Sequence, residues 1–284
     1  MPAPPPDARS LEGQVVSVRP SGSDGVILRI ATATRLPPLR AARFFMLRRE
    51  DRLSPAIPRP FSVYREERGE LEFMIKVMGP GTRALAESVE GTRLRVVGPL
   101  GNGWPALAGG GAPWVMLAGG IGSAPFHMAI EQALAGMDGE RACKPGEIFY
   151  LYGAARADLL YELEAFRKLG VAVHTCTMDG SHGSQGHVLQ LLEALQRAGK
   201  IPERVRLLAC GPERMLEAVE GHARKHELEC WLSLETLMGC GVGICNGCPV
   251  PTLPEGPLGS WPNAKCCVEG PVFKTDAITL CEAH

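Results

Sequence analysis

Residues 240–248 read Cys240-Gly-Val-Gly-Ile-Cys245-Asn-Gly-Cys248, and Cys267 follows further along the chain. The spacing C-x4-C-x2-C with a distant fourth cysteine is that of plant-type [2Fe–2S] clusters. A two-iron cluster needs four converging thiolates, and one tight loop can supply three of them. Glycines in such a loop let the backbone curl around a cluster and bring N–H groups close to its sulfurs. The stretch therefore predicts a module, over residues 235–284, that carries electrons one at a time.

Other interpretations of these cysteines are open. Zinc sites usually pair their cysteines in two short C-x2-C units, and the loop contains only one such pair. A disulfide framework is disfavoured because the chain is long and shows no secretory signal. The spacing alone does not decide between the adjacent Cys266 and Cys267 as the distant ligand. Most of the remaining cysteines are expected to be small buried hydrophobes, namely Cys143, Cys176, Cys210, Cys230 and Cys281.

The composition is that of an ordinary soluble protein. The chain has 284 residues, of which 45% are hydrophobic and 21% charged, and its formal net charge is -1. This length gives room for two domains and an appendage. No basic excess points to nucleic acid, and no long apolar run points to a membrane span. We expect a disordered Pro/Ala-rich leader over residues 1–10 and, from reduced cysteines without an export signal, a cytoplasmic protein.

Short β-rich runs separated by turn residues fill the part of the chain from residue 11 to residue 103. About six such strands predict a small antiparallel β-barrel, and one helical stretch interrupts them at residues 82–89. The expected strands are residues 15–18, 26–30, 44–48, 60–64, 70–77 and 92–97.

Strands and helices alternate from residue 104 to residue 234. This alternation predicts a doubly wound parallel α/β domain, so the fold class as a whole is multi-domain α+β. The expected strands are residues 114–118, 148–152, 171–176, 206–209 and 231–234. The expected helices are a stretch ending at residue 135 and residues 159–169, 187–198 and 212–226.

Two motifs on the predicted barrel suit a flavin dinucleotide. In Arg59-Pro60-Phe61-Ser62, the arginine offers a fork of donors for a pyrophosphate, and the hydroxyl can hydrogen-bond a flavin ring. Gly79-Pro80-Gly81-Thr82 precedes the helix, where exposed N–H groups attract phosphate. A plain helix cap formed by Thr82 is an equally good explanation of the second motif.

Glycine-containing loops are expected together at the carboxyl edge of the parallel sheet, where open α/β sheets bind ligands. Gly119-Gly120-Ile-Gly122 follows the first strand, although Pro125 stands where a Rossmann fingerprint would have glycine. Tight packing of the turn would explain these glycines equally well. Cys210-Gly211-Pro212 follows the fourth strand, and its thiol and glycine can flank a nicotinamide. A third loop begins Asp179-Gly180-Ser181. Three such loops together favour a nucleotide site.

The order of these motifs resembles the ferredoxin–NADP reductase superfamily. The C-terminal pattern narrows the resemblance: Glu235-x-x-Met238-x-Cys240, the cluster loop, and then Cys267-x-Glu-Gly270-Pro-Val-Phe273. It is similar to the electron-transfer subunits of class 1B dihydroorotate dehydrogenases. The resemblance covers essentially residues 11–280.

The resemblance implies FAD on the barrel, NAD on the parallel domain and a [2Fe–2S] cluster in the module. Aligned on Gly270, the fourth ligand falls on Cys267, after Cys240, Cys245 and Cys248. FAD would contact Arg59, Pro60, Phe61, Ser62, Met74, Ile75, Lys76, Gly81 and Thr82. NAD would lie across Gly119, Gly120, Gly122, Gly211 and Pro212, with Cys210 as the catalytic residue beside the nicotinamide.

The resemblance also implies a partner, an FMN-containing subunit that oxidises dihydroorotate, in a heterotetramer of two plus two chains. Electrons would pass through the cluster to FAD and on to NAD⁺, in de novo pyrimidine (UMP) biosynthesis, with FAD joining one-electron to two-electron carriers. The alternative is a related subunit that serves a hydrogenase, a sulfide dehydrogenase or ferredoxin. The remaining hypothesis is a regulatory flavoprotein or a zinc-bearing binding module without a redox role. The proline-rich segment 249–262 is either part of the partner interface or a stiff surface loop.

Overall fold

Six antiparallel strands close the N-terminal barrel, in the order β1-β2-β5-β4-β3-β6. They are β1 (Arg9–Ser21), β2 (Gly25–Thr32), β3 (Phe44–Arg49), β4 (Arg59–Glu67), β5 (Glu70–Lys76) and β6 (Arg93–Leu100). Aromatic and aliphatic side chains fill the interior, and the rings of Phe45 and Phe73 meet edge to face at 5.8 Å. The helix α1 (Pro80–Ala86) packs against this barrel. The predicted barrel is therefore confirmed.

The computed structural model describes residues 7–259 and 261–280. Most of the expected leader, up to residue 6, lies outside these residues. Residues 7–10 are described and are not a loose leader. Asp7 forms an ion pair of 2.6 Å with Arg43, and Arg9 begins β1. Arg43 is buried, so it requires a carboxylate partner, and Asp7 supplies it.

The second domain is a sheet of seven strands in the order β10-β9-β8-β7-β11-β12-β15. Its strands from this part of the chain are β7 (Trp114–Gly119), β8 (Ile148–Ala154), β9 (Ala172–Thr177), β10 (Ser184–Gln185), β11 (Arg206–Cys210) and β12 (Cys230–Ser233). All are parallel. The longer helices are α2 (Phe126–Ala135), α4 (Val188–Arg197) and α5 (Glu213–Lys225). The predicted parallel α/β domain is confirmed.

One predicted helix, residues 159–169, is wrong in its extent. The structure has a 3₁₀ turn η3 (Ala157–Leu159) and a short α3 (Leu163–Arg167). Between them Glu162 has a left-handed backbone with φ 53°. Its carboxylate accepts two hydrogen bonds from Arg19, at 2.8 and 2.6 Å, and one from Ser21 at 2.9 Å. This contact with the barrel explains why the helix is interrupted at Glu162.

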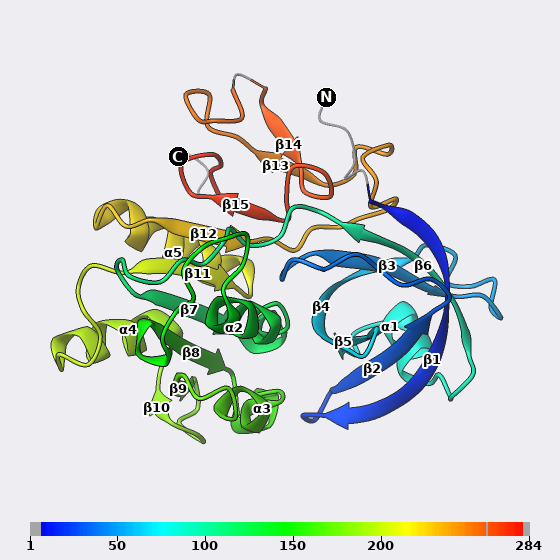
Figure 1. Cartoon of the computed structure of the whole chain (residues 1–284), viewed down its shortest axis with the longest axis horizontal. Coiled ribbons are helices and arrows are strands. Elements are labelled where there is room, and N and C mark those ends of the chain that lie inside the picture. Colours follow the sequence, from blue (N-terminus) through cyan, green and yellow to red (C-terminus); the bar gives the residue numbers. More distant parts are fainter. Residues whose placement is uncertain (1–6, 260, 281–284) are drawn as a thin grey trace.

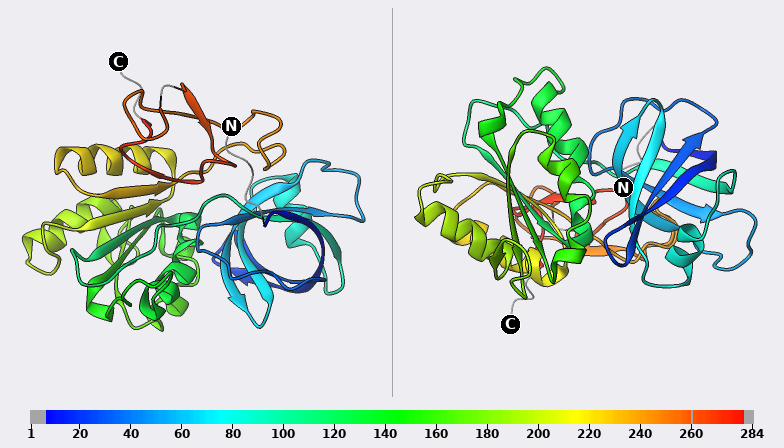
Figure 2. Two further views of the ribbon diagram at one scale, coloured as in Figure 1. Left: turned by 45° about the horizontal axis from the view of Figure 1, so that its top comes forward. Right: turned by 90° about the horizontal axis from the view of Figure 1, so that it is seen from below.

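The C-terminal module lies across the barrel and the sheet (Figure 1, orange to red), and the two turned views in Figure 2 show the same arrangement. It contains the hairpin of β13 (Pro249–Pro251) and β14 (Asn263–Lys265), and the strand β15 (Val272–Lys274). β15 pairs antiparallel with β12, so the module contributes the seventh strand of the sheet. The other short connecting turns are η1 (Gly120–Ser123) and η2 (Pro145–Glu147). Within the described residues, we find no helix with the length and apolarity needed to cross a membrane.

Candidate functional site

The four predicted cluster cysteines lie in the module as two contacting pairs. The sulfurs of Cys248 and Cys267 are 3.3 Å apart, and the Cys245 N–H donates to the sulfur of Cys240 at 3.5 Å. Gly241 and Gly243 have φ of 72° and 80°, a conformation that glycine adopts without strain. The backbone can therefore fold back tightly enough for one short loop to present three thiols.

The loop favours the thiolate form that binds metals. Partial burial raises the pKa of Cys240, but the N–H groups of residues 242, 244 and 245 outweigh it and lower that pKa to about 7. A hydrogen bond with the Cys267 thiol lowers the pKa of Cys248 to about 6, and the same contact raises that of Cys267. The two sulfurs therefore share a proton that a cation would displace.

The two adjacent cysteines have different surroundings. Cys266 is fully buried, its sulfur lies 3.7 Å from the Leu234 carbonyl oxygen, and burial raises the pKa of its thiol to about 12. Only Cys267 brings its sulfur to the cluster loop. The predicted donor set remains Cys240, Cys245, Cys248 and Cys267, whose chemistry fits a four-thiolate cluster, although no three of the described metal-binding side chains are close enough together to form a metal site.

A cavity of about 200 Å³ opens where the barrel, the sheet and the module meet. Six of the residues expected to contact FAD line it, namely Pro60, Phe61, Ser62, Met74, Lys76 and Thr82. Ile75 does not, because side chains alternate along a strand and that of Ile75 is buried in the barrel core. The module also contributes to the wall, through Glu235, Thr236, Met238 and Pro271. Sequence reasoning quoted Glu235 and Met238 only as parts of a family pattern.

Arg59 lies across the start of α1 rather than in this cavity. A Cβ added at Gly81 would meet the Arg59 Nε at 2.9 Å, so glycine allows the guanidinium to pass close to the helix. Arg48, Arg49 and Arg52 line the same hollow. Four arginines around one recess suit a pyrophosphate, and the sequence analysis identified only Arg59 among them.

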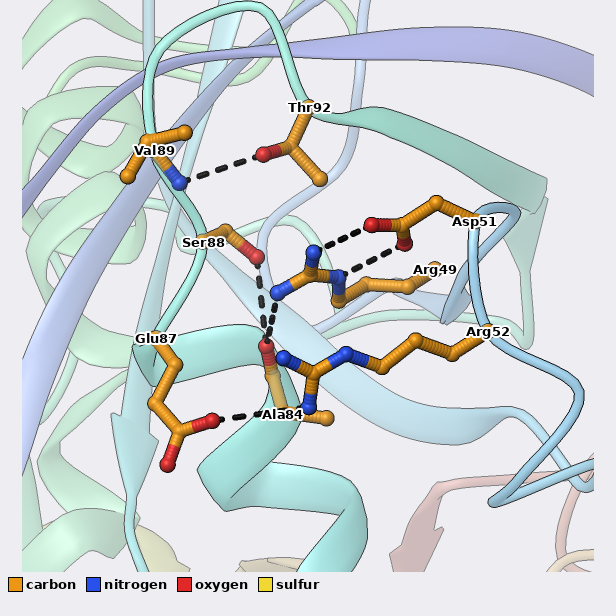
Figure 3. Close-up of polar contacts among 8 residues, drawn as sticks. All are labelled: Arg49, Asp51, Arg52, Ala84, Glu87, Ser88, Val89 and Thr92. Atoms are coloured by element: carbon orange, nitrogen blue, oxygen red, sulfur yellow. Dashed lines mark hydrogen bonds and ion pairs between the residues drawn. The ribbon is translucent and has the colours of Figure 1, made fainter.

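Arg49 fixes α1 from the opposite end (Figure 3). Its Nη1 donates to the Ala84 carbonyl oxygen at 3.1 Å, and its other nitrogens hold Asp51 at 2.9 and 2.5 Å. The Ser88 hydroxyl donates to the same Ala84 carbonyl at 3.3 Å. At the start of the helix, the Thr82 hydroxyl accepts the N–H groups of Met78 and Gly79. Thr82 is therefore a cap and also a cavity residue.

The two loops expected to hold a nicotinamide nucleotide touch each other. A Cβ added at Gly122 would lie 2.5 Å from the Cys210 carbonyl oxygen, and one at Gly211 would lie 3.0 Å from the Gly119 Cα. Glycine is therefore required for this approach, which meets the expectation of a tight turn. Gly120 has φ of 55°, and its carbonyl accepts the hydroxyl of Tyr152 at 3.0 Å, a contact that the sequence did not reveal. The Asp179-Gly180-Ser181 loop follows β9 and lies beside the segment that follows β8. There the Ser181 hydroxyl accepts the Ala157 N–H.

Cys210 lies behind this surface. It is 2% exposed and is not among the residues that line the cavity, and burial raises the pKa of its thiol. Such a thiol stays neutral and serves as a small apolar group. The geometry places Cys210 behind the two loops, and its predicted catalytic role beside a nicotinamide stays a prediction.

Comparison with known proteins agrees with this geometry. Residues 235–279 match the iron–sulfur cluster binding domain of dihydroorotate dehydrogenase B. The electron transfer subunit of dihydroorotate dehydrogenase B (NAD(+)) from Lysinibacillus sphaericus is 34% identical over 242 residues, covering 84% of this chain and 86% of that protein. The Bacillus cereus subunit is 32% identical over 241 residues with the same coverage. This chain belongs to the dihydroorotate dehydrogenase B electron transfer subunits.

Solved structures of ferredoxin–NADP reductases share the fold of this chain. The NADH-dependent reduced ferredoxin–NADP oxidoreductase is similar with a TM-score of 0.76 and 25% identity, covering 93% of this chain and 89% of that one. A ferredoxin NADP⁺ reductase from Neisseria gonorrhoeae, solved with FAD and NADP, shares the fold at a TM-score of 0.58 and 17% identity, covering 78% of this chain and 92% of that one. The chain is the electron-transfer component of an oxidoreductase, an iron–sulfur flavoprotein.

Proposed function

We propose that this chain takes electrons singly from an FMN-containing subunit that oxidises dihydroorotate and delivers them in pairs to NAD⁺. A [2Fe–2S] cluster supplies one-electron transfer when bound, and FAD joins it to two-electron chemistry. This assignment rests on family membership and on the residues that the fold brings together. The pathway served would be de novo pyrimidine (UMP) biosynthesis in the cytoplasm, in a heterotetramer of two plus two chains.

The residue assignments follow the geometry. The cluster ligands would be Cys240, Cys245, Cys248 and Cys267. The flavin would rest against Pro60, Phe61, Ser62, Met74 and Thr82, with Arg59 and Gly81 at its pyrophosphate and Ile75 as support from the core. NAD would lie over Gly119, Gly120, Gly122, Gly211 and Pro212, backed by Cys210. The corresponding units are residues 11–103, 104–234 and 235–284.

The observation that carries the proposal is the contact between the cluster loop and the flavin cavity. Met238 lines the cavity and is two residues before Cys240. A Cβ added at Gly241 would lie 2.6 Å from the Cγ of Met46 in β3 and 3.1 Å from Leu100 in β6. The loop that presents the thiols therefore lies directly on the barrel, and one side of the cavity is built from the module. This arrangement supports direct electron transfer between a bound cluster and a bound flavin.

Exposed apolar side chains lie on and beside the cluster loop. Leu237 is 90% exposed and Ile244 is 81% exposed, and Cys245, next to Ile244, is exposed as well. Large apolar side chains gathered at an electron-transfer loop fit a protein partner. We assign this face, around Leu237 and Ile244, to the dihydroorotate-oxidising subunit.

The test is an anaerobic pull-down of the tagged chain from its native cell, followed by an assay of dihydroorotate-dependent NAD⁺ reduction. We expect the FMN-containing subunit to co-purify with that activity. Ile244→Glu should reduce recovery of the partner, whereas Val89→Glu, on an exposed barrel residue, should not. Recovery of a hydrogenase or a ferredoxin instead, without dihydroorotate oxidation, would refute the proposed substrate.

A ferredoxin-linked function is the second candidate. The similarity to the NADH-dependent reduced ferredoxin–NADP oxidoreductase covers 93% of this chain, including the module. Under this alternative the cluster would exchange electrons with ferredoxin, and reduced ferredoxin would support NAD⁺ reduction when added alone. Dihydroorotate and its oxidising subunit would then be dispensable in the same assay.

A further inference from the structure

The end of the β1–β2 hairpin holds the segment 157–162 of the parallel domain against the barrel (Figure 1). Arg19 donates two hydrogen bonds to the Glu162 carboxylate, at 2.8 and 2.6 Å. The Tyr161 hydroxyl donates to the Asp24 carboxylate at 2.5 Å, and the Tyr161 ring is buried. These four residues, which we call the clasp, fix where the segment lies relative to the barrel.

Two glycines of the hairpin allow this close approach. Gly22 has φ of 62°, and a Cβ added there would lie 2.6 Å from the Asp158 carbonyl oxygen. A Cβ added at Gly25 would lie 3.0 Å from the Cε1 of Tyr161. A larger residue at either position would push the segment away from the barrel. The fit between the two domains therefore depends on the sequence of the hairpin.

The hydroxyl of Tyr152 in β8 connects the clasp to the turn η1. The Tyr161 N–H donates to this hydroxyl at 2.8 Å. The hydroxyl also lies 3.0 Å from the Gly120 carbonyl oxygen and 3.1 Å from the Ser123 hydroxyl. Because a carbonyl oxygen can only accept, Tyr152 is the donor in its contact with Gly120. Tyr152 is fully buried, so water does not compete for these hydrogen bonds.

The turn η1 belongs to both expected cofactor sites. NAD is expected over its glycines, and Ile121 of the same turn lines the flavin cavity together with Met74 of the barrel. The Ser123 hydroxyl donates to the Met74 sulfur at 3.3 Å, which is a second link between the turn and the barrel. A displacement of η1 would therefore change the distance between a nicotinamide and a flavin, although the residues that bind NAD would still be present.

We propose that Tyr152 is a positioning residue for hydride transfer, because its hydroxyl holds η1, and with it a bound nicotinamide, at the distance from the flavin that the clasp sets. The inference rests on the proposed function. In the reversible step, NADH gives a hydride, two electrons with one proton, to oxidised flavin, and NAD⁺ and the reduced flavin anion result. The reacting atoms must approach closely, and a small displacement costs a large factor in rate. Tyr152 itself is buried and exchanges no proton in this step.

The first test is Tyr152→Phe, which removes one hydroxyl and keeps the ring. In the protein with FAD and cluster bound, flavin reduction by saturating NADH should slow about 10-fold, the factor for one lost buried hydrogen bond. The dissociation constant of NADH should change by less than about twofold, because the binding residues remain. The charge-transfer absorbance of reduced flavin with NAD⁺ should weaken, and electron transfer from reduced flavin to the cluster should keep its rate.

Tyr64→Phe is the matched control for this test. Tyr64 is also a fully buried tyrosine, and within the described residues its hydroxyl has no hydrogen-bond partner. This variant should change neither flavin reduction nor the charge-transfer absorbance. A Tyr152→Phe protein with an unchanged rate of flavin reduction would refute the proposal. A loss of rate explained wholly by weaker NADH binding would refute it as well.

Hydrogen exchange of the intact protein tests the role of Tyr152 without turnover. Peptides that cover residues 119–124 should exchange about 10-fold faster in Tyr152→Phe, because η1 loses its hydrogen bond at Gly120. The barrel strands should exchange as in the native protein. If exchange in η1 is unchanged, Tyr152 does not hold the turn and the proposal fails. If NADH does not bleach the flavin even in the native protein, the proposed function fails, and hydrogen exchange still decides whether Tyr152 holds η1.

A double-mutant cycle tests whether the clasp acts through Tyr152. Glu162→Gln weakens the ion pair with Arg19 and should by itself slow flavin reduction by NADH. The double variant Tyr152→Phe with Glu162→Gln should be no slower than Tyr152→Phe alone, because the path from the clasp to η1 is already broken. Fully additive losses would overturn this path and show that the two residues act independently.

Discussion

The barrel and the cluster module are built on different physical grounds. The barrel closes six strands around a core in which Phe45, Phe73 and Ile75 are fully buried, so apolar burial alone can hold it. In the module, β13, β14 and β15 have three residues each, and the predicted cluster thiols range from the buried Cys248 and Cys267 to the exposed Cys245. Such a small unit cannot bury enough apolar surface by itself. We therefore expect a bound cluster to stabilise the module, whereas the barrel needs no such support.

Cys245→Ser gives the largest expected effect and tests the dependence of the module on its cluster. We expect complete loss of the cluster's visible absorbance and electron paramagnetic resonance signal, because a serine hydroxyl is a poor ligand for iron in this setting. Hydrogen exchange should accelerate over residues 235–279 and remain slow in the barrel strands, since metal binding provides the module's folding free energy. Cys176→Ser, at a buried cysteine of the sheet, is the matched control and should keep the cluster. A normal two-iron signal in Cys245→Ser would contradict the ligand assignment.

The adjacent Cys266 and Cys267 allow a test of which thiol in the module is the fourth ligand. Cys267→Ser should lose most of the cluster, because its sulfur lies 3.3 Å from that of Cys248. Cys266→Ser should keep the cluster and destabilise the protein by about 1–3 kcal/mol, the cost of placing a hydroxyl in a buried site. Iron content per chain and thermal unfolding measure the two effects. If Cys266→Ser lost more iron than Cys267→Ser, the fourth ligand would be Cys266 and not Cys267.

On the barrel side, Arg59→Ala should weaken FAD binding without unfolding the domain. Removing charge-assisted hydrogen bonds to a pyrophosphate costs about 1.5–3 kcal/mol, which corresponds to roughly 10- to 100-fold in the dissociation constant. Flavin fluorescence on dilution measures it. Arg93→Ala, an exposed arginine of β6, should leave FAD affinity unchanged. Full flavin occupancy in dilute Arg59→Ala would exclude the pyrophosphate role.

The smallest effect is expected for Arg49→Met, which keeps the aliphatic stem and removes the hydrogen bond to Ala84. Loss of this tether at the end of α1 should cost about 1 kcal/mol and raise the FAD dissociation constant only a few-fold. The denaturation midpoint and FAD affinity should change together, because the helix places Gly81 and Thr82. A change in stability with unaltered FAD affinity would show that α1 does not need this anchor.

The sequence predicts those parts of the molecule that local patterns determine. The six barrel strands, the parallel sheet and the cysteine loop follow from alternation, apolar runs and spacing within short windows. Gly122 and Gly211 were recognised as loop glycines because their neighbours alternate between strand and helix. The four cysteines expected from spacing and resemblance form two contacting pairs in the module.

Contacts between distant segments were not predictable. The helix expected at residues 159–169 is interrupted because Glu162 binds Arg19, a residue of another domain. The family alignment carried Ile75 over as a flavin contact, but the strand points its side chain into the core. Glu235 carried no local signal for a cavity residue, since only the meeting of barrel, sheet and module forms that cavity.

The pairing of β15 with β12 covers an edge of the sheet that would be open in a chain without β15. β12 would otherwise be the last parallel strand of the sheet, with its free backbone N–H and C=O groups turned to solvent. Open strand edges recruit strands from other molecules and start aggregation. Because β15 follows Cys267 by only a few residues, the same module that admits electrons also seals the sheet. A chain that lacks its cluster is therefore expected to have a less well protected sheet edge as well as a broken electron path.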